Sequence, residues 1–390
     1  MTLSFTNTEI AFRSKTDSAL RRSHWIFRAL GHPWLVRAGT RALRVAVVLH
    51  LPVRGLIKRT LFRQFCGGET IHECGPTIDA LWRYRIGTIL DVAVEGREAE
   101  AEFDHTADEV ERTIDLAENN VAIPFSVFKV TGVARFALLE KVHAGAPLDE
   151  QGRAEWARAK ARVERLCARA HAKSVRIFLD AEESWIQGAI DDLADSMMAR
   201  FNTETAIVYN TIQLYRRDRL EFLRKSHQRA RAGGYQLGLK LVRGAYMEKE
   251  RAFAAARQTD PSVLPDKAAT DANFDEALRF SVANIDRIAL VAGTHNETST
   301  LLLTQLMDQH GLRRDDPRIF FSQLLGMSDH LSYNLANAGY NVCKYVPYGP
   351  VRSVVPYLTR RAEENTSVQG QTGRELALIA EERRRRRSLG

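Results

Sequence analysis

The fold is decided by a stretch that starts at Leu237 and reads Leu-Gly-Leu-Lys-Leu-Val-Arg-Gly-Ala-Tyr as far as Tyr246. It holds a short apolar run followed by polar residues and a glycine, as a buried parallel strand does where it enters a loop. Seven further apolar runs occur along the chain, separated by longer charged segments. The eight runs are Ile89–Val94, Ile123–Val130, Val175–Leu179, Ala206–Tyr209, Leu237–Val242, Ile288–Ala292, Ile319–Ser322 and Val342–Val346.

The segments that separate these runs predict helices, because several of them place apolar residues at helical spacing. They are Ala107–Asn119, Ala154–His171, Glu183–Phe201, Leu214–Ala232, Ala268–Asn284, Thr298–His310 and Ser328–Ala338, and Val351–Asn365 follows the eighth run. Strands that alternate with helices imply a parallel sheet covered on both faces. Eight such units in about 280 residues predict an α/β fold, a closed (βα)8 TIM-like barrel. A doubly wound sheet is the alternative, but no G-x-G-x-x-G motif follows the first strand.

The barrel with its cofactor site is expected to occupy residues 66–370, after an N-terminal helical arm over residues 1–65. Asp17–Leu30 and Pro33–Val48 carry the helical spacing of that arm, and Gly67-Gly68 marks the break after it. Residues 371–390 are expected to form a basic C-terminal helix or tail. Its five consecutive arginines, Arg383–Arg387, predict a frayed, solvated end, with attraction to anionic lipid as the alternative.

Composition narrows the class of protein without naming a partner. The chain has 390 residues, 45% of them apolar, and a formal net charge of +8. A basic balance favours anionic partners such as phosphates, nucleic acid or a membrane surface. The four cysteines have no metal-binding spacing and are expected to be reduced. The first ten residues do not form a secretory signal, and Ala42–Val53 is too short and polar to span a bilayer. We therefore expect a cytoplasmic protein.

Polar or aromatic side chains lie at or just after nearly every predicted strand, where a barrel places its chemistry. They include Lys129, Asp180, Gln213, Lys240, Arg243, Tyr246, Thr294, His295, Gln323 and Tyr345. Ordinary polar loops are the alternative explanation. No metal cluster, G-x-S-x-G elbow or Walker A motif occurs. We therefore expect no metal, and chemistry carried by an organic cofactor or by acid–base side chains. The cations, with Arg360 and Arg361 added, suit a phosphate or a carboxylate.

Several motifs resemble those of proline dehydrogenases, in that family's order over roughly residues 65–366. The fifth-strand stretch resembles the family's fifth-strand motif, and Gln323-Leu324-Leu325-Gly326-Met327 resembles the seventh. Further matches are Lys344-Tyr345-Val346-Pro347-Tyr348-Gly349-Pro350, Tyr357-Leu358-Thr359-Arg360-Arg361-Ala362-Glu363-Glu364-Asn365, Thr294-His295-Asn296 and Gly68-Glu69-Thr70-Ile71. The resemblance is closest to the stand-alone enzymes.

The resemblance implies a barrel that binds FAD non-covalently, oxidises L-proline to Δ1-pyrroline-5-carboxylate and passes electrons to a membrane quinone. The residues implied near the flavin are Asp180, Gln213, Lys240, Arg243, Tyr246, Thr294, His295 and Glu364. Those implied at the proline carboxylate are Lys129, Arg360 and Arg361, and those at the proline ring are Ala245, Leu325 and Tyr345. Glu69 is implied to pair with Arg360 as a gate. The quinone implies a peripheral contact with the inner face of the membrane.

Lys240 departs from the family's bifunctional members, which have an arginine near the flavin N5. Lysine keeps the charge but lacks the planar fork of arginine, so the potential and geometry of the flavin are expected to differ. Three other functions stay open at this stage. They are a hydroxyproline dehydrogenase of the same family, a barrel lyase or isomerase acting on a phosphorylated substrate, and a basic scaffold. Nucleic acid is not expected as a partner, because no aromatic-rich basic stretch of the RNA-binding type occurs.

Overall fold

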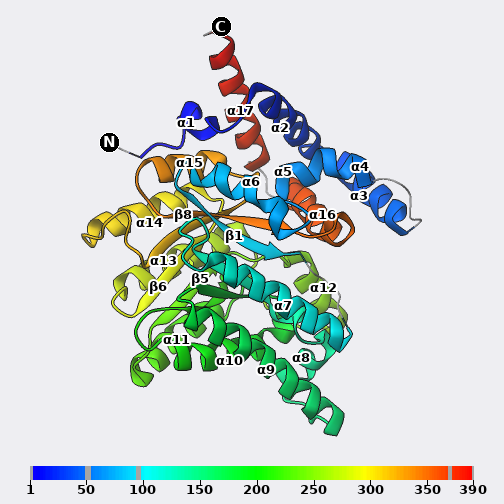
Figure 1. Cartoon of the computed structure of the whole chain (residues 1–390), viewed down its shortest axis with the longest axis vertical. Coiled ribbons are helices and arrows are strands. Elements are labelled where there is room, and N and C mark those ends of the chain that lie inside the picture. The colour runs from blue at the N-terminus through cyan, green and yellow to red at the C-terminus, as the bar shows by residue number, and fades with distance from the viewer. Residues whose placement is uncertain (1–2, 49–53, 94–97, 368–370, 389–390) are drawn as a thin grey trace. The chain divides into compact units, whose positions relative to one another are not determined.

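The computed structural model describes residues 3–48, 54–93, 98–367 and 371–388, and it confirms the predicted barrel (Figure 1). The closed barrel has strand order β1 to β8. The strands are β1 (Ile86–Val92), β2 (Phe125–Lys129), β3 (Arg176–Asp180), β4 (Val208–Gln213), β5 (Leu237–Val242), β6 (Ile288–Gly293), β7 (Ile319–Leu324) and β8 (Val342–Tyr348). All eight predicted runs overlap a strand. The first strand starts at Ile86 rather than Ile89, and Val94 of the predicted run lies outside the described residues.

The chain divides into two compact units, which are described separately. One is formed by Met1–Glu95 together with Gln323–Gly390, and the other by Gly96–Ser322. In the first unit β1 pairs in parallel with β8, Ile89 lying opposite Tyr345. In the second unit β2 to β6 pair in chain order, and β6 pairs with the start of β7.

Helices follow the strands as the alternation predicts. In the second unit they are α7 (Glu100–Ala117), α8 (Phe136–His143), α9 (Glu150–Ala172), α10 (Ser184–Phe201), α11 (Arg219–Gly233), α12 (Met247–Arg257), α13 (Lys267–Ala283) and α14 (Glu297–Gln309), with the 3-10 turn η2 (Val130–Gly132) after β2. The helix predicted from Leu214 starts only at Arg219. The reason is that the Leu214 and Tyr215 N–H groups donate to the Val242 and Arg243 carbonyls and so extend the strand pairing. Helices α8 and α12 were not predicted.

The first unit holds the two ends of the chain. Its helical segments are α1 (Thr8–Phe12), α2 (Asp17–Leu30), α3 (Pro33–Val48), α4 (Arg54–Ile57), the π-helical turn η1 (Lys58–Phe62), α5 (Arg63–Phe65), α6 (Ile71–Trp82), α15 (Asp329–Asn337), α16 (Val351–Ser367) and α17 (Gln371–Arg387). The bounds of α2 and α3 are those that the spacing predicts. Within the described ranges, no helix has an apolar run long enough to cross a membrane.

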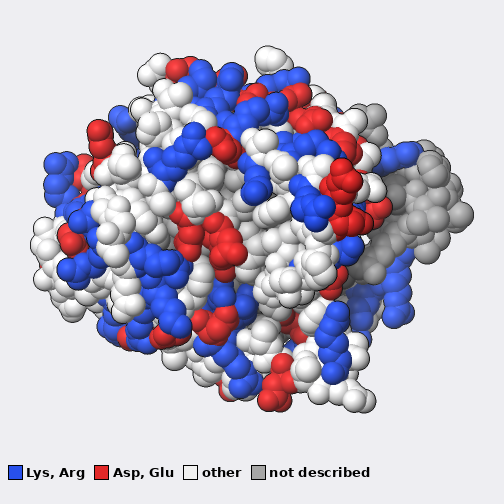
Figure 2. All heavy atoms as spheres, turned by 90° about the horizontal axis from the view of Figure 1, so that it is seen from below, with Lys and Arg blue, Asp and Glu red and all other residues white. Residues whose placement is uncertain are grey.

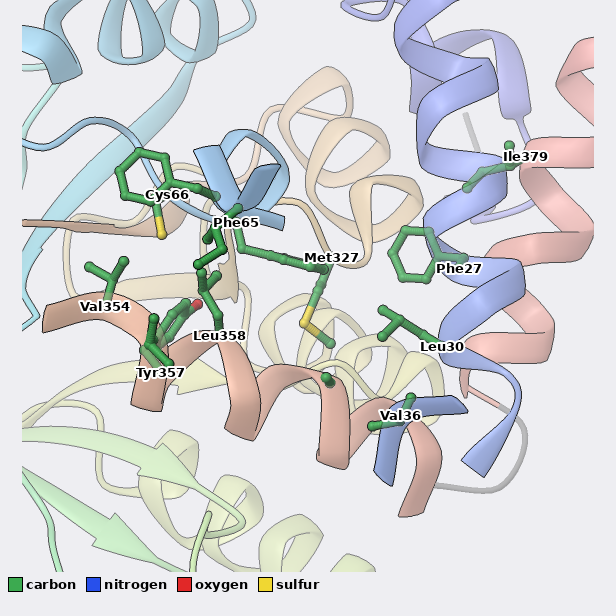
Figure 3. Packing of buried hydrophobic residues seen from close by; sticks show 14 of the residues in the cluster. Phe27, Leu30, Val36, Phe65, Cys66, Met327, Val354, Tyr357, Leu358 and Ile379 are labelled. Carbon is green, nitrogen blue, oxygen red and sulfur yellow. The ribbon is translucent and has the colours of Figure 1, made fainter. Parts of the chain in front are cut away.

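The arm helices share one buried apolar cluster with the last two helices of the chain (Figure 3). Phe27 and Leu30 of α2 and Val36 of α3 belong to it, together with Leu358 of α16 and Ile379 of α17. Figure 3 shows the Phe27 and Leu30 side chains projecting from the same side of α2. Burial of such large apolar side chains stabilises the packing by about 1.5–3 kcal/mol each. Arm and C-terminal helix therefore pack together within the first unit.

The expectation of a frayed basic tail was wrong. The arginine run lies on α17, which ends at Arg387 and packs beside α2 (Figure 1). Arg385 and Arg386 both donate to the buried carboxylate of Glu382. Arg386 also donates to Asp17 (2.9 Å) and to the Phe12 carbonyl (2.9 Å). Carboxylates and helix-end carbonyls thus hold the guanidinium groups, which a reading of the arginine run alone does not anticipate.

Aromatic side chains fill the amino end of the barrel interior in the second unit. The Phe125 ring stacks on Phe178 with centroids 4.6 Å apart, and Tyr209 and Phe320 meet Phe125 edge to face. Arg176 lies over the Phe125 and Phe320 rings. Because side chains alternate along a strand, positions two and four residues further on point into the same interior. By this alternation the interior positions at the carboxyl ends of β2, β3 and β4 are polar. They are Lys129, Asp180 and Gln213.

Candidate functional site

A buried ion pair lies in the barrel interior of the second unit. The Lys240 ammonium of β5 donates to the Asp180 carboxylate of β3, and it lies 5.0 Å from the centre of the Phe178 ring. Lys240 is only 4% exposed. A charge buried this deeply requires a partner, and the carboxylate supplies it. Two residues that the sequence predicted separately are therefore brought into direct contact.

Strand β4 adds polar atoms that the protein does not satisfy. The Gln213 Oε1 and Thr211 Oγ1 atoms are buried, and neither has a hydrogen-bond partner in the described part of the chain. Thr211 lies opposite Lys240 in the β4–β5 register, and Gln213 lies one alternation further toward the carboxyl end. Buried polar atoms of this kind normally have partners. An amide and a hydroxyl that can donate and accept fit the ring edge of the flavin that the resemblance implies, which itself carries donors and acceptors.

Arg243 is fixed by three side chains at the carboxyl end of β5. Its Nε donates to Asp271 (2.6 Å), its Nη1 to the Thr294 hydroxyl (2.6 Å) and its Nη2 to the Ser299 hydroxyl (2.9 Å). Gly244, which follows it, has φ +136, and a Cβ there would lie 2.4 Å from the Tyr215 ring. The glycine is therefore required for the turn that leaves the strand. Thr294 and Arg243 are thus brought together at neighbouring strand ends.

Lys129 ends β2 and is accompanied by an acid that the sequence analysis missed. The buried carboxylate of Glu182, in the loop after β3, accepts from the Thr131 N–H (3.0 Å) and from the Thr131 hydroxyl. Burial raises the pKa of Glu182 to about 7, although the Lys129 charge and the Thr131 hydrogen bonds act in the opposite direction. The signal in the sequence was its position two residues after Asp180. A carboxyl group that titrates near neutrality therefore lies beside a predicted carboxylate-binding lysine.

The other predicted residues of the second unit lie in loops at strand ends. Ala245 is exposed and Tyr246 is half-buried, directly before α12. His295 is half-buried between Thr294 and Asn296, whose side chain caps α14 by accepting from the Ser299 N–H. These positions follow β5 and β6, as predicted.

In the first unit Tyr345 and Leu325 are joined through the backbone. The Leu325 N–H donates to the Tyr345 carbonyl (2.8 Å), which ties the loop after β7 to β8. Lys344, the residue before Tyr345, is fully buried and donates to the Met327 carbonyl and to Asp329 of α15 (2.9 Å). Adjacent strand residues point to opposite faces, so Tyr345 points away from α15 and into the barrel. Tyr345 itself is almost fully buried.

The arm supports the same loop. The Gln64 side chain donates to the Gly326 carbonyl (2.9 Å) and accepts from the Ser23 hydroxyl (3.1 Å). Gly326 has φ +76, and a Cβ there would lie 2.1 Å from the Gln64 carbonyl. Only glycine fits so close to the arm.

A second link from the arm runs through a buried carboxylate. Asp329 pairs with Lys344 and with Lys15, whose ammonium lies 3.1 Å from the other carboxylate oxygen. Burial alone would raise the pKa of Asp329, but the two ammonium charges hold it well below its usual range. Position and charge of the loop that carries Leu325 therefore depend on the arm.

The predicted carboxylate-binding arginines lie on α16. Arg361 is buried with its guanidinium 5.0 Å from the centre of the Tyr357 ring, and Arg360 is half-buried. Glu69, the predicted gate, accepts from Lys58 (2.7 Å) and from the Val351 N–H (3.3 Å) at the start of α16. The backbone of Glu364 also lies in α16, but its side chain is outside the described part of the structure.

Comparison with known proteins gives a consistent family. The family profile described as proline dehydrogenase matches residues 74–374. The carbapenem antibiotics biosynthesis protein CarD of Pectobacterium carotovorum subsp. carotovorum is 36% identical over 329 residues, which cover 83% of each chain. Mitochondrial proline dehydrogenase 1 of Dictyostelium discoideum is 34% identical over 87% of this chain and 67% of its own length. Hydroxyproline dehydrogenase of Xenopus laevis is 30% identical over 98% of this chain and 90% of its own length.

Among solved structures, proline utilization A from Bdellovibrio bacteriovorus superposes with a TM-score of 0.70 at 19% identity. The match covers 94% of this chain and 37% of that protein, so the chain spans little more than a third of its length. At this identity the likeness concerns the fold, the parallel barrel with its surrounding helices.

Proposed function

This chain belongs to the proline dehydrogenase family of oxidoreductases, and from that premise we propose that it oxidises L-proline to Δ1-pyrroline-5-carboxylate with FAD as cofactor. The observation that carries the proposal is the family match over residues 74–374, which span all eight barrel strands. The unsatisfied Gln213 Oε1 atom, on the strand that pairs with the strand of Lys240, supports a polar ring system as the bound group. The residues proposed to hold the flavin are those predicted from the resemblance.

The oxidation removes two electrons and a hydrogen from proline C5 and a proton from the ring nitrogen, so that a C5–N double bond forms. A bound flavin would accept the hydride equivalent at its N5. The protein's own contribution is position and field. Arg360, Arg361 and Lys129 hold the carboxylate, and three cations there disfavour a further positive charge nearby. They therefore favour the neutral ring nitrogen, whose proton passes to solvent.

Tyr345, Leu325 and Ala245 are proposed to pack on the proline ring, and Glu69 is proposed to pair with Arg360 over it. The backbone link between Leu325 and Tyr345 supports this grouping, because it holds the two residues next to each other. Lys240 stands where the bifunctional members of the family have an arginine. Its contact with Asp180 fixes a flexible side chain that lacks the guanidinium fork.

A hydroxyproline dehydrogenase is the second candidate, since relatives named so in Xenopus laevis and Bos taurus match nearly the whole chain. Tyr345 favours proline. A buried tyrosine ring against the substrate leaves an added hydroxyl without water and without a good partner. A lyase or isomerase acting on a phosphorylated substrate is disfavoured by membership of an oxidoreductase family.

The electron acceptor and the location complete the proposal. We infer that electrons pass to a membrane quinone, and that the enzyme works in the cytoplasm with a peripheral contact at the inner face of the membrane. Within the chain, residues 66–370 are proposed to supply the catalytic barrel.

One spectroscopic experiment tests the proposal. The purified protein should show a flavin absorbance band at about 450 nm. Anaerobic L-proline should bleach this band and yield Δ1-pyrroline-5-carboxylate, identified by mass spectrometry. Trans-4-hydroxy-L-proline serves as the comparison substrate. A protein without flavin, or a flavin that proline does not reduce, would overturn the assignment, and faster bleaching by hydroxyproline would transfer it to the second candidate.

A further inference from the structure

The positive charge of the protein is concentrated in one segment. Between Asp17 and Glu69 the sequence has ten lysine and arginine residues and no aspartate or glutamate. The whole chain has a net charge of +8, so the remaining residues together are slightly acidic, at −2. Figure 2 shows one face of the molecule, on which basic and acidic side chains are interspersed. The segment contains helices α2 and α3.

The same two helices expose large apolar side chains. Trp25 on α2 is 63% exposed, Trp34 on α3 is 66% exposed, and Leu35 beside it is also exposed. Their opposite faces are occupied, because Phe27 and Val36 are buried in the cluster shown in Figure 3. Among the residues that the structure describes, nothing covers most of either tryptophan side chain, and both remain largely in water. Tryptophan is the residue most typical of the boundary between lipid and water, where its ring is buried and its N–H stays wet.

Arginines lie at helical spacing from the two tryptophans, Arg21 and Arg28 on either side of Trp25 and Arg37 and Arg41 after Trp34. Arg21, Arg28, Arg37 and Arg41 are all exposed on α2 and α3, and the Arg28 guanidinium lies 5.5 Å from the centre of the Trp25 ring. An apolar centre with a cationic border on a helical surface is typical of segments that lie in the plane of a membrane surface. We name this surface the arm face, formed by Trp25, Trp34, Leu35, Arg21, Arg28, Arg37 and Arg41.

We propose that the arm face docks onto an anionic lipid surface. The proposal rests on the proposed function, which includes a peripheral contact with the membrane, and it names the surface that makes this contact. The purpose of the contact is access to a quinone dissolved in the bilayer. The positive charge of the arm face favours acidic headgroups. The exposed tryptophans favour lipid over nucleic acid, because an apolar ring can be buried in the headgroup region of a membrane. The C-terminal arginine run is a weaker candidate, because Glu382 and Asp17 already hold Arg385 and Arg386.

Vesicle co-sedimentation tests the proposal. The full-length protein should bind vesicles of mixed phosphatidylglycerol and phosphatidylcholine at low salt, less at physiological salt, and hardly at all to pure phosphatidylcholine. Arg37→Gln combined with Arg41→Gln should lower the partition coefficient about 25-fold, at about fivefold per arginine. Trp25→Ser combined with Trp34→Ser should lower it about tenfold or more.

Two matched variants serve as controls. Arg384→Gln with Arg387→Gln removes two exposed arginines of α17, and Val121→Ser removes an apolar side chain that is 72% exposed in the second unit. Both should bind like wild type. Circular dichroism and proline-dependent reduction of a soluble dye show that every variant is folded. If proline reduces no dye in wild type, the proposed function fails while the vesicle result still stands on its own.

Fluorescence locates the contact. Lipids brominated near the headgroup should quench the tryptophan emission of wild type, and Trp25→Phe with Trp34→Phe should remove that quenching although Trp82, Trp156 and Trp185 remain. Absence of vesicle binding, undiminished binding by the arm variants, loss of binding in the α17 control, or a preference for duplex DNA over vesicles would each overturn the proposal.

Discussion

Glu182→Gln should remove a pH-dependent term from the stability of the protein. The buried carboxyl has its pKa raised by burial to about 7, about 2.5 units above its ordinary value. Between pH 4.5 and 7 the unfolded chain has lost this proton and the folded chain has kept it. The stabilising contribution is therefore complete below pH 4.5 and is lost as the pH rises through 7. At about 1.4 kcal/mol per unit, the loss amounts to about 3 kcal/mol.

Glutamine keeps the contacts to Thr131 and cannot ionise, so the variant should gain about 3 kcal/mol over wild type between pH 4.5 and pH 8. Urea unfolding of both proteins at these two pH values measures the difference. Glu183→Gln is the control, because this neighbouring carboxylate pairs with Lys249 and its charge contributes to the raised pKa of Glu182. Its replacement should keep the pH-dependent term of Glu182, somewhat reduced, whereas Glu182→Gln should abolish it. Ionised Glu182 also competes for the Lys129 charge, so the KM of wild type for proline should rise above pH 7 and that of the variant should not. Equal pH dependence in both proteins would refute the reasoning.

Five other substitutions test separate parts of the site. Arg360→Met and Arg361→Met should each raise the KM for proline by an amount equivalent to about 2–4 kcal/mol while flavin absorbance is kept; unchanged steady-state kinetics would remove them from the carboxylate site. Glu69→Ala should lower kcat/KM at a cost in stability of no more than about 1 kcal/mol, and a large drop in Tm would mark a structural role instead. Wild type should prefer proline over trans-4-hydroxyproline by about tenfold or more, and Tyr345→Ser should narrow this ratio; equal turnover of both substrates by wild type speaks against the assignment. Gly326→Ala should cost about 2–4 kcal/mol in urea unfolding, against about 1 kcal/mol for Gly339→Ala, which has positive φ but open space around it.

The barrel could be predicted because its information is local. Each strand is a short apolar run and each covering helix has its own spacing, so the order of elements follows from the sequence without knowledge of contacts. The predicted start of a helix was wrong where a contact between distant segments determines it. The segment after Gln213 has helical spacing, but the Leu214 and Tyr215 N–H groups donate to the Val242 and Arg243 carbonyls, and the helix starts only at Arg219.

The sequence predicts which residues lie at the strand ends. It does not predict which of these residues contact one another. That Asp180 meets Lys240, or that Arg243 meets Thr294, depends on the register of neighbouring strands. Glu182 was missed because its importance comes from burial, which a polar loop sequence does not reveal. The arginines of α17 were misjudged for the same reason, since their partner Glu382 is buried by distant helices.

The division of the chain also orders its assembly during synthesis. One compact unit is continuous, Gly96–Ser322, and all of its residues are synthesised before the first residue of α16. The other joins Met1–Glu95 to Gln323–Gly390. Lys15 therefore cannot pair with Asp329, and Phe27 cannot share a cluster with Ile379, until some 300 further residues have been translated. At bacterial or eukaryotic rates of about 5–20 residues per second this interval lasts about 15 to 60 seconds. Throughout this interval the apolar side chains of the arm lack the C-terminal helices against which they pack in the folded protein.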